Sequence, residues 1–555
     1  MKTEMTGIIL QIVLMVALSY PLGKYIAKVY KGEKNLLDFM KPVERLIYRA
    51  GGIDPLEEMT WKRFLKALLA INAVWLVWGM ALLLLQGWLP LNPDGNPSQP
   101  FDQALNTCIS FLVNCNLQHY SGESGMTYFT QLFVVMFFQF VTAATGMAAM
   151  AGVMKAMAAK TTQTIGNFWQ LLVVSVTRIL LPLSLIVGFF LILEGVPMTF
   201  EGKEHLTTLE GREQLIAQGP VAAIVPIKQL GTNGGGFFGA NASHPLENPT
   251  YLTNMVECVS ILLLPMAMVF ALGFYLKRKK LSYVIFGVMF TAYLAGVGLN
   301  TYVELEGNPR IEAMGIDQSG GAMEGKEVRF GAAATALWSV TTTASSNGSV
   351  NGMHSSMMPL SNLVEMLNMQ TNTWFGGVGV GLLNYYTFLI LAVFISGLMV
   401  GRTPELLGKK VEAPEMKIAT LIALLHPLAI LAGVAISASI TQRTGAHGLS
   451  EQLYEFTSSA ANNGSGMEGL ADNTPFWNYA TALVLLLGRY LPIIGQVAIA
   501  GMLAQKRYVP AGAGTLPTDT VTFGMMTFAV ISIIAALAFF PAHALSTLAA
   551  ALGLG

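Results

Sequence analysis

The sequence predicts an all-α polytopic membrane protein with ten transmembrane helices. Of its 555 residues, 53% are hydrophobic and only 12% are charged, whereas soluble domains carry about 25% charged residues. A second pattern occurs four times: a half-length apolar segment, a polar run rich in Asn, Gly, Ser and Thr, and a long apolar span. Such repetition predicts four pseudo-symmetric helix–pore loop–helix repeats around one axis, with the polar runs as a selectivity filter.

Ten windows contain enough consecutive apolar residues to span a bilayer, for which about 20 are needed. The first is followed by several lysines and by no small-residue cleavage site, so we expect a retained helix and not a signal peptide. The windows lie near residues 6–24, 64–87, 127–153, 168–193, 252–276, 281–300, 376–400, 417–440, 476–504 and 520–543.

Four further apolar segments, 101–112, 219–230, 329–340 and 450–459, have about half the spanning length. We expect them to be re-entrant helices, because each one precedes a polar run. The runs occupy residues 113–118, 231–237, 341–349 and 457–465. The predicted organisation is an N-terminal extra helix with an inner loop (1–63), four repeats (64–153, 168–276, 281–400 and 417–504) and a C-terminal extra helix (519–555).

Basic residues predict the orientation of the chain in the membrane. Most of the 32 Lys and Arg residues lie in alternate connecting segments, which are 21–66, 154–167, 277–280, 401–417 and 505–509. Positive residues favour the cytoplasmic side. We therefore expect both termini and all four polar runs to be extracytoplasmic.

The residue types of the runs suit a dehydrated monovalent cation. Irregular backbone is tolerated at membrane depth only where it lines water or is buried in protein. Gly234, Gly348 and Gly464 permit backbone angles that other residues avoid, and no run contains a carboxylate. This favours a neutral cage of backbone carbonyls, as in potassium-selective filters, over a divalent site, which uses carboxylates. The alternative is that the runs are ordinary turn-rich extracellular loops.

Other functional classes find little support in the sequence. Formal net charge is zero, which gives no basis for a nucleic-acid partner. The chain contains neither a phosphate-binding loop nor an Asp-Lys-Thr-Gly phosphorylation site, so we expect no bound nucleotide and no catalysis by this chain alone. The histidines near the runs are scattered in sequence and are interpreted as ordinary surface residues: His119, His244, His354 and His447.

Over essentially its whole length, the chain resembles the potassium-binding, channel-like subunits of Kdp-type potassium-pumping ATPases, within the superfamily of potassium transporters. The most specific segments are 88–92, 121–123, 231–237, 241–249, 323–331, 401–405, 458–464 and 475–477. The resemblance implies that extracytoplasmic K⁺ is selected by a filter and passed through an intramembrane tunnel to a P-type ATPase subunit. It also implies small accessory subunits, membrane lipid and a bacterial inner membrane. A freestanding potassium channel or symporter subunit of the same superfamily remains the alternative.

Carried over residue by residue, the resemblance implies a filter that binds K⁺ through backbone groups. Its residues are Asn114, Cys115, Asn116, Gln118, Thr232, Asn233, Gly234, Thr343, Ser345, Ser346, Asn347, Gly348, Asn462, Asn463 and Gly464. Cys115 departs from the family pattern, which has a hydroxyl residue there. The third run contains one residue more than the pattern, Asn347, which leaves its register open by one position.

Three arginines are candidates for either gating or structural roles. Arg178 and Arg489 lie in the middle of predicted spans, where an arginine is costly and normally faces protein or water. Arg402 follows the seventh span. The resemblance favours a gating role for Arg402, and an anchor at the inner membrane face is the alternative.

Overall fold

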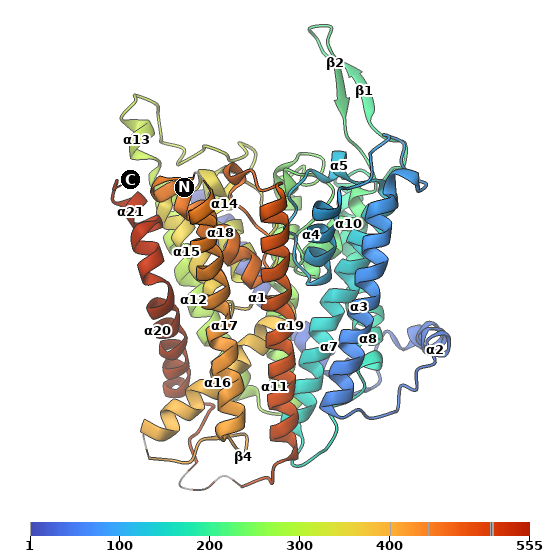
Figure 1. Ribbon diagram of the computed structural model, residues 1–555, viewed down its shortest axis with the longest axis vertical. Coiled ribbons are helices and arrows are strands. Elements are labelled where there is room, and N and C mark those ends of the chain that lie inside the picture. The colour runs from blue at the N-terminus through green and yellow to red at the C-terminus, as the bar shows by residue number, and fades with distance from the viewer. Residues whose placement is uncertain (1, 400, 442, 511, 513–514, 555) are drawn as a thin grey trace.

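The computed structural model describes residues 2–399, 401–441, 443–510, 512 and 515–554. It is a bundle of long helices with the short helices of the polar runs gathered in one half (Figure 1). Within the described residues, ten helices are long and apolar enough to cross a membrane. The predicted all-α polytopic fold with ten transmembrane helices is therefore confirmed.

The spanning helices agree with the predicted windows to within a few residues at most ends. Two of them contain an internal π-helical turn, η3 or η4, which divides the helix. In chain order the spans are α1 (Lys2–Tyr30), α3 (Trp61–Leu85), α6–η3–α7 (Tyr128–Thr130, Gln131–Met136 and Phe137–Ala158), α8–η4–α9 (Phe168–Ser175, Val176–Leu180 and Leu181–Leu193), α11 (Tyr251–Leu276), α12 (Lys279–Glu306), α16 (Val380–Met399), α17 (Ala413–Ile440), α19 (Pro475–Gln505) and α20 (Val521–Leu545).

The remaining elements are short. The re-entrant helices are α4 (Phe101–Leu112), α10 (Val221–Leu230), α14 (Gly331–Ala344) and α18 (Gly445–Ala461). The other helices are α2 (Lys41–Ala50), α5 (Gly122–Gly125), α13 (Pro309–Glu312), α15 (Pro359–Thr371) and α21 (Thr547–Ala551). Single turns of 3₁₀ helix are η1 (Asp38–Met40), η2 (Gln86–Trp88), η5 (Asn241–Ser243), η6 (His354–Ser356) and η7 (Glu468–Leu470). Two antiparallel hairpins pair β1 (Glu204–Thr207) with β2 (Glu213–Ile216) and β3 (Glu405–Leu406) with β4 (Lys409–Lys410).

Each re-entrant helix packs against spanning helices of its own predicted repeat. Helix α4 contacts α3 and α7, α10 contacts α9 and α11, and α18 contacts α17 and α19. In the third repeat, α14 contacts α12 and the short helix α15. Helix α19 also contacts α4 and α7, so the fourth repeat closes back on the first.

Several elements were not predicted from the sequence, among them α15, α2 and the β1–β2 hairpin. Helix α15 separates the third run from the span α16, with residues 372–379 between them. Helix α2 lies beside the bundle, and the β1–β2 hairpin projects beyond the end that carries the polar runs (Figure 1). The β1 strand is exposed throughout, so the sequence offers no apolar pattern by which to find it.

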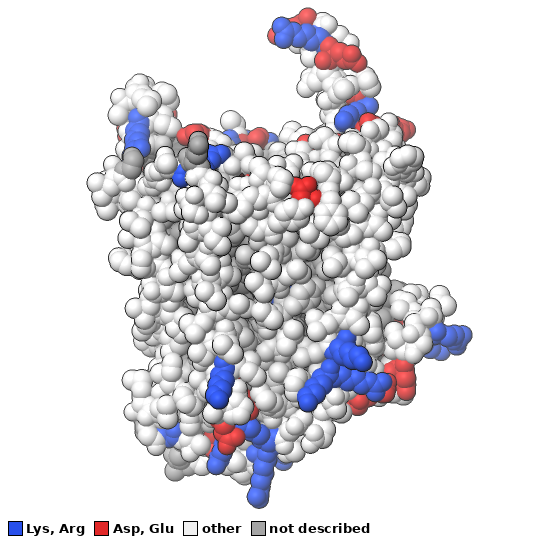
Figure 2. Space-filling model, in the orientation of Figure 1, with Lys and Arg blue, Asp and Glu red and all other residues white. Residues whose placement is uncertain are grey.

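Charge is concentrated at the two ends of the bundle. Figure 2 shows Lys and Arg gathered at the end opposite the runs, and a middle zone almost without charged side chains. Both chain ends lie at the end that carries the runs (Figure 1). This distribution is typical of a helical bundle whose middle faces lipid.

Candidate ion-binding site

The polar runs are joined to one another by asparagine side chains. The Nδ2 of Asn233 donates to the carbonyl of Cys115 at 3.1 Å. In the same way, Asn347 donates to the carbonyl of Lys228 at 3.2 Å, and Asn463 donates to that of Ser345 at 2.9 Å. Each asparagine therefore links its own run to the repeat that precedes it in the chain.

The same three asparagines also close identical local turns. The Oδ1 of Asn233 accepts from the amide of Gly235 at 3.1 Å, that of Asn347 from Ser349 at 2.9 Å, and that of Asn463 from Ser465 at 3.0 Å. Asn347 thus occupies the place of Asn233 and Asn463 and is not an insertion in the third run. Thr343 lies earlier, within α14, where its hydroxyl donates to the carbonyl of Ser339.

A glycine follows each of these asparagines and has a left-handed backbone. The φ angles are 86° at Gly234, 72° at Gly348 and 104° at Gly464. A Cβ atom would lie 1.5 Å from the carbonyl oxygen of Asn347 at Gly234, and 2.3 Å from that of Asn463 at Gly348. At Gly464 it would lie 2.5 Å from the backbone nitrogen of Asn116. Each glycine therefore abuts the next run, and only glycine fits.

The first run completes a closed ring with a different set of residues. The Nδ2 of Asn114 donates to the carbonyl of Gly231 at 2.9 Å, which joins the first run to the second. Asn116 stands where the other runs have glycine, and its Nδ2 lies 3.3 Å from the carbonyl of Gly348. We call residues 114–116, 232–234, 346–348 and 462–464 the ring. All ring residues are uncharged, and all are buried except Gly464, which is half-buried.

Cys115 and Gln118, two predicted filter residues of the first run, both contact the second run. The Cys115 carbonyl accepts from Asn233, and this contact does not depend on which side chain Cys115 carries. Gln118 lies just beyond the ring and pairs with Gly236 in both directions. Its Oε1 accepts from the Gly236 amide at 3.0 Å, and its Nε2 lies 3.4 Å from the Gly236 carbonyl.

A buried lysine supports the second run from behind, and the sequence analysis did not identify it. Lys228 of α10 is fully buried and forms an ion pair with Glu247, which is also fully buried. Its Nζ also donates to Asn241, whose Nδ2 donates to the carbonyl of Gly234 at 3.0 Å. The sequence feature that could have identified Lys228 is its position as a lone lysine near the end of an apolar re-entrant helix.

A cavity of about 280 Å³ opens at the side of the ring where residues 117–121 and 465–468 leave it, which is called the outer side below. Its lining includes Asn116, Gly348, Gly464, Glu468 and Asp472. His119 borders it and is 5% exposed. Burial lowers the pKa of His119, but the nearby carboxylates of Asp472 and Glu455 outweigh this and raise it to about 9. The interpretation as a surface histidine is therefore wrong for His119, and also for His354, which is 1% exposed.

Residues 372–379 cross beneath the ring on its other side. The amide of Gly376 donates to the carbonyl of Ala344 at 2.8 Å, and that of Val378 donates to Thr232 Oγ1 at 2.9 Å. The Nδ2 of Asn372 lies 3.2 Å from the carbonyl of Ala461. This loop therefore contacts the second, third and fourth runs at their inner ends.

A second cavity, of about 60 Å³, lies beside this loop. Its lining includes Asn372 of the loop and Ala460, near the end of α18. On the other side it is lined by residues of α17 and α20, among them His426 and Ile531. The cavity thus extends from the inner side of the ring toward the peripheral helices.

The three candidate arginines have different surroundings. Arg178 binds Glu44 through Nε at 2.5 Å and Nη2 at 2.6 Å, and Asp38 through Nη1 at 2.9 Å. These bonds attach α2 and η1 to the bundle, which supports a structural role for Arg178 over a gating role. Arg489 is 3% exposed, its Nη2 lies 3.5 Å from the carbonyl of Thr142, and no ion pair to it occurs among the described residues.

Arg402 does not contact the ring. Its Nη1 donates to the carbonyl of Thr515 at 3.1 Å, and it lines a surface cavity together with Arg278, Glu405 and Asp519. This cavity is formed by the connecting loops at the end of the bundle opposite the runs. The surroundings support the alternative of an anchor at the inner face.

Comparisons with known proteins agree with this architecture. The potassium-transporting ATPase potassium-binding subunit of Bacteroides fragilis is 72% identical over 568 residues, which cover 100% of both chains. The subunit of the same name from Geobacillus kaustophilus is 47% identical over 534 residues and 95% of both chains. The structure of the potassium transporter TrkH from Vibrio parahaemolyticus matches with a TM-score of 0.51 at 13% identity, covering 89% of this chain and 98% of that chain.

The TrkH likeness, at such low identity, shows a shared fold alone. The sequence relatives carry more weight, because they match from end to end at high identity. A family model described as "KdpA: Potassium-transporting ATPase A subunit" matches residues 9–552. The chain therefore belongs to the family of potassium-transporting ATPase A subunits.

Proposed function

We propose that the ring binds K⁺ from the outer side through its backbone carbonyls and selects it over Na⁺. The observation that carries this proposal is the recurrence of one asparagine–glycine turn in three runs, closed into a ring by the first. Buried, uncharged backbone at the centre of a helical bundle suits a weakly hydrated monovalent ion. The names of the relatives, which are potassium-binding subunits, support the same ion.

The proposed coordinating residues are those of the ring, with Ser345 and Thr343 at the inner end of the third run and Gln118 at the outer entrance. Gly234, Gly348 and Gly464 hold neighbouring runs in backbone contact, which sets the size of the cage. The side chains of Asn233, Asn347 and Asn463 brace the ring, since their amides already donate to carbonyls of the preceding repeat. The predicted repeat boundaries fit this proposal, because each re-entrant helix packs on the spans of its own repeat.

The ion leaves the ring sideways in this account. Loop 372–379 contacts the inner ends of the runs, and both this loop and the buried Arg489 lie close to Gly146. We therefore expect them to block a straight path inward, because a positive guanidinium opposes the passage of a cation. The cavity between Asn372 and the peripheral helices α17 and α20 supports a lateral route. We therefore assign Arg489 to preventing leakage, and Arg178 and Arg402 to holding the inner loops.

The chain needs an energy source from outside itself. The name of its relatives refers to an ATPase, and this sequence contains no phosphorylation motif. We therefore assign to this chain the role of a non-catalytic subunit that delivers K⁺ to a P-type ATPase subunit, with small accessory subunits, in the bacterial inner membrane. Both termini and the mouth of the ring then face outward, as the distribution of basic residues favours.

The test is the ATPase activity that co-purifies with this chain in mild detergent. Stimulation of hydrolysis by K⁺ but not by Na⁺ is expected. Intact K⁺ binding without any associated ATPase would refute the partner and favour a freestanding transporter. Equal stimulation by both ions would refute selection by the ring.

A further inference from the structure

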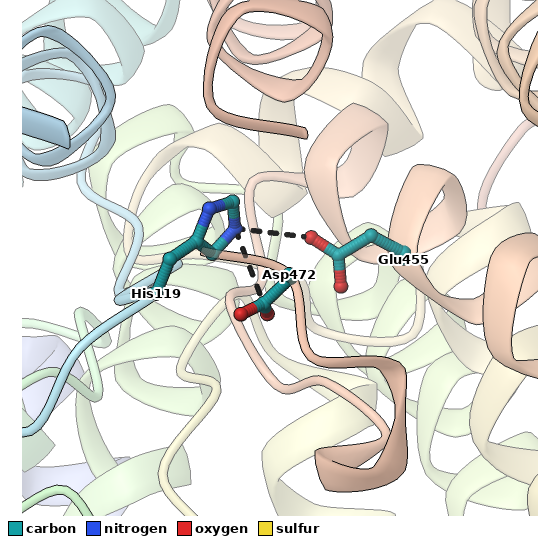
Figure 3. Close-up of side chains that lie close together, drawn as sticks. All are labelled: His119, Glu455 and Asp472. Carbon is teal, nitrogen blue, oxygen red and sulfur yellow. Dashed lines mark hydrogen bonds and ion pairs between the residues drawn. The ribbon is translucent and has the colours of Figure 1, made fainter. Parts of the chain in front are cut away.

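Three side chains that are far apart in the sequence converge beside the outer cavity. His119 follows the first run, Glu455 lies on α18, and Asp472 lies between η7 and α19 (Figure 3). The Nε2 of His119 is 3.3 Å from Glu455 Oε1 and 3.7 Å from Asp472 Oδ2. One ligand atom from each residue lies within 4.8 Å of the other two.

The His119 ring is oriented by a second layer of hydrogen bonds. Asn478 donates its Nδ2 to Asp102 Oδ2 at 2.8 Å, so its Oδ1 must face His119. That Oδ1 lies 2.7 Å from His119 Nδ1 and accepts a hydrogen bond from its N–H. Nε2 is therefore the nitrogen presented to the two carboxylates. A histidine fixed through its other nitrogen in this way is typical of metal sites.

The two carboxylates are otherwise poorly paired. Glu455 is fully buried, and its Oε2 has no hydrogen-bond partner among the described residues. Within the same part of the chain, His119 is the sole ion-pair partner of both Glu455 and Asp472. A buried carboxylate oxygen without a partner is costly, and a cation placed between these groups would remove that cost.

We propose that His119, Glu455 and Asp472 form a binding site for a divalent transition metal such as Zn²⁺ at the outer mouth of the ring. Zinc ligands at about 2.0–2.1 Å in a tetrahedron lie about 3.3 Å apart, close to the 3.3 and 3.7 Å that separate His119 Nε2 from the two carboxylate oxygens. Two carboxylates neutralise the charge of the ion. Asp472 is 29% exposed at its side chain, which gives access from the cavity and leaves the fourth position to water.

The nitrogen ligand decides the class of metal. Ca²⁺ takes six to eight oxygen ligands and Mg²⁺ takes an octahedron of oxygens with several waters, whereas imidazole suits zinc and its neighbours.

Occupancy would place a dication beside the entrance to the ring. Asp472 and Gly464 line the same cavity, so zinc bound between the two carboxylates would cancel the negative charge that attracts K⁺ at this entrance and would weaken its entry. We infer that zinc inhibits K⁺-stimulated activity. This consequence rests on the proposed function, whereas zinc binding itself does not.

Zinc binding is tested on the purified complex, titrated with ZnSO₄ in the presence of excess Mg²⁺ and Ca²⁺. Bound metal is counted by mass spectrometry, and its ligands are identified by X-ray absorption. We expect one zinc per chain with one imidazole nitrogen and oxygen ligands. His119→Gln and Asp472→Asn should each weaken binding about tenfold or more, and Asn478→Leu should weaken it about 10–100-fold.

The matched controls are His205→Gln and His447→Gln. Both histidines are exposed and lie beside a single glutamate, so adventitious zinc would bind there. Loss of zinc in the controls, or unchanged affinity in Asp472→Asn, would overturn the site. Asp472 is partly exposed, so its variant is informative even if His119→Gln fails to fold.

The functional consequence has a separate readout. Zinc should raise the K⁺ concentration needed for half-maximal ATPase stimulation in the parent and not in Asp472→Asn. Zinc that binds at this site without changing K⁺ stimulation would refute the inhibition while leaving the metal site intact. Absence of any K⁺ stimulation in the parent would instead count against the proposed function.

Discussion

Gly234→Ala should disrupt the ring at the contact between its second and third runs. The new Cβ would lie 1.5 Å from the Asn347 carbonyl oxygen, so one of the two runs must move by more than an ångström. The residue would also retain a φ of 86°, which costs an L-residue about 1–2 kcal/mol. Such an energy corresponds to a factor of about 5–30 in an equilibrium constant. We expect K⁺ affinity to fall by at least this factor.

The assay is the K⁺ concentration for half-maximal stimulation of the co-purified ATPase, measured together with the response to Na⁺. Gly466→Ala is the matched control, because its Cβ would meet only Glu455 Oε2 at an ordinary 3.5 Å. The control should keep the parent affinity. A Gly234→Ala protein with unchanged K⁺ affinity and unchanged discrimination against Na⁺ would refute the ring as the selective site.

Three further predictions follow from buried charges. Glu247→Gln leaves Lys228 buried without its ionic partner and should cost about 3–5 kcal/mol of stability; a melting temperature equal to that of the parent would contradict this. The carboxylates of Asp472 and Glu455 raise the pKa of His119 to about 9 from an ordinary 6.5. The protonated histidine therefore stabilises the fold, and this stabilisation is complete below pH 6.5. This contribution, at most about 3 kcal/mol, should be lost as pH rises through 9. His119→Gln should flatten that part of the curve of thermal stability against pH, and an unaltered slope would refute the assignment. Arg489→Gln should increase K⁺ flux into proteoliposomes without ATP, and no increase in flux would argue against its role in preventing leakage.

The spanning helices and the re-entrant helices were predictable because lipid imposes a strong pattern on sequence. Every backbone polar group in a bilayer must be satisfied within the protein. Long apolar segments therefore indicate helices that cross the membrane, and half-length apolar segments indicate helices that enter it without crossing. The left-handed glycines were also predictable as a type, since Gly234, Gly348 and Gly464 stand in polar runs between helices. Helix α15 was missed because its 13 residues are too few to span a membrane and include polar side chains such as Asn362, Glu365 and Gln370.

The groups that hold the ring together could not be found from the sequence. The equivalence of Asn347 with Asn233 and Asn463 appears only in their shared hydrogen bonds, and counting residues suggested an insertion instead. Lys228 forms an ion pair with Glu247, which lies in an irregular loop, and the course of such a loop cannot be predicted from hydrophobic periodicity. His119 and Asp472 belong to different repeats, so only the closure of the fourth repeat on the first brings them together.

The most direct test of the central claim is to locate the bound ion. Crystals of the complex soaked in Rb⁺, a substitute for K⁺ with a usable anomalous signal, should show a peak enclosed by residues 114–116, 232–234, 346–348 and 462–464. Excess K⁺ should remove that peak and excess Na⁺ should not. A ring without a peak, in crystals that bind Rb⁺ elsewhere in this chain, would contradict the account.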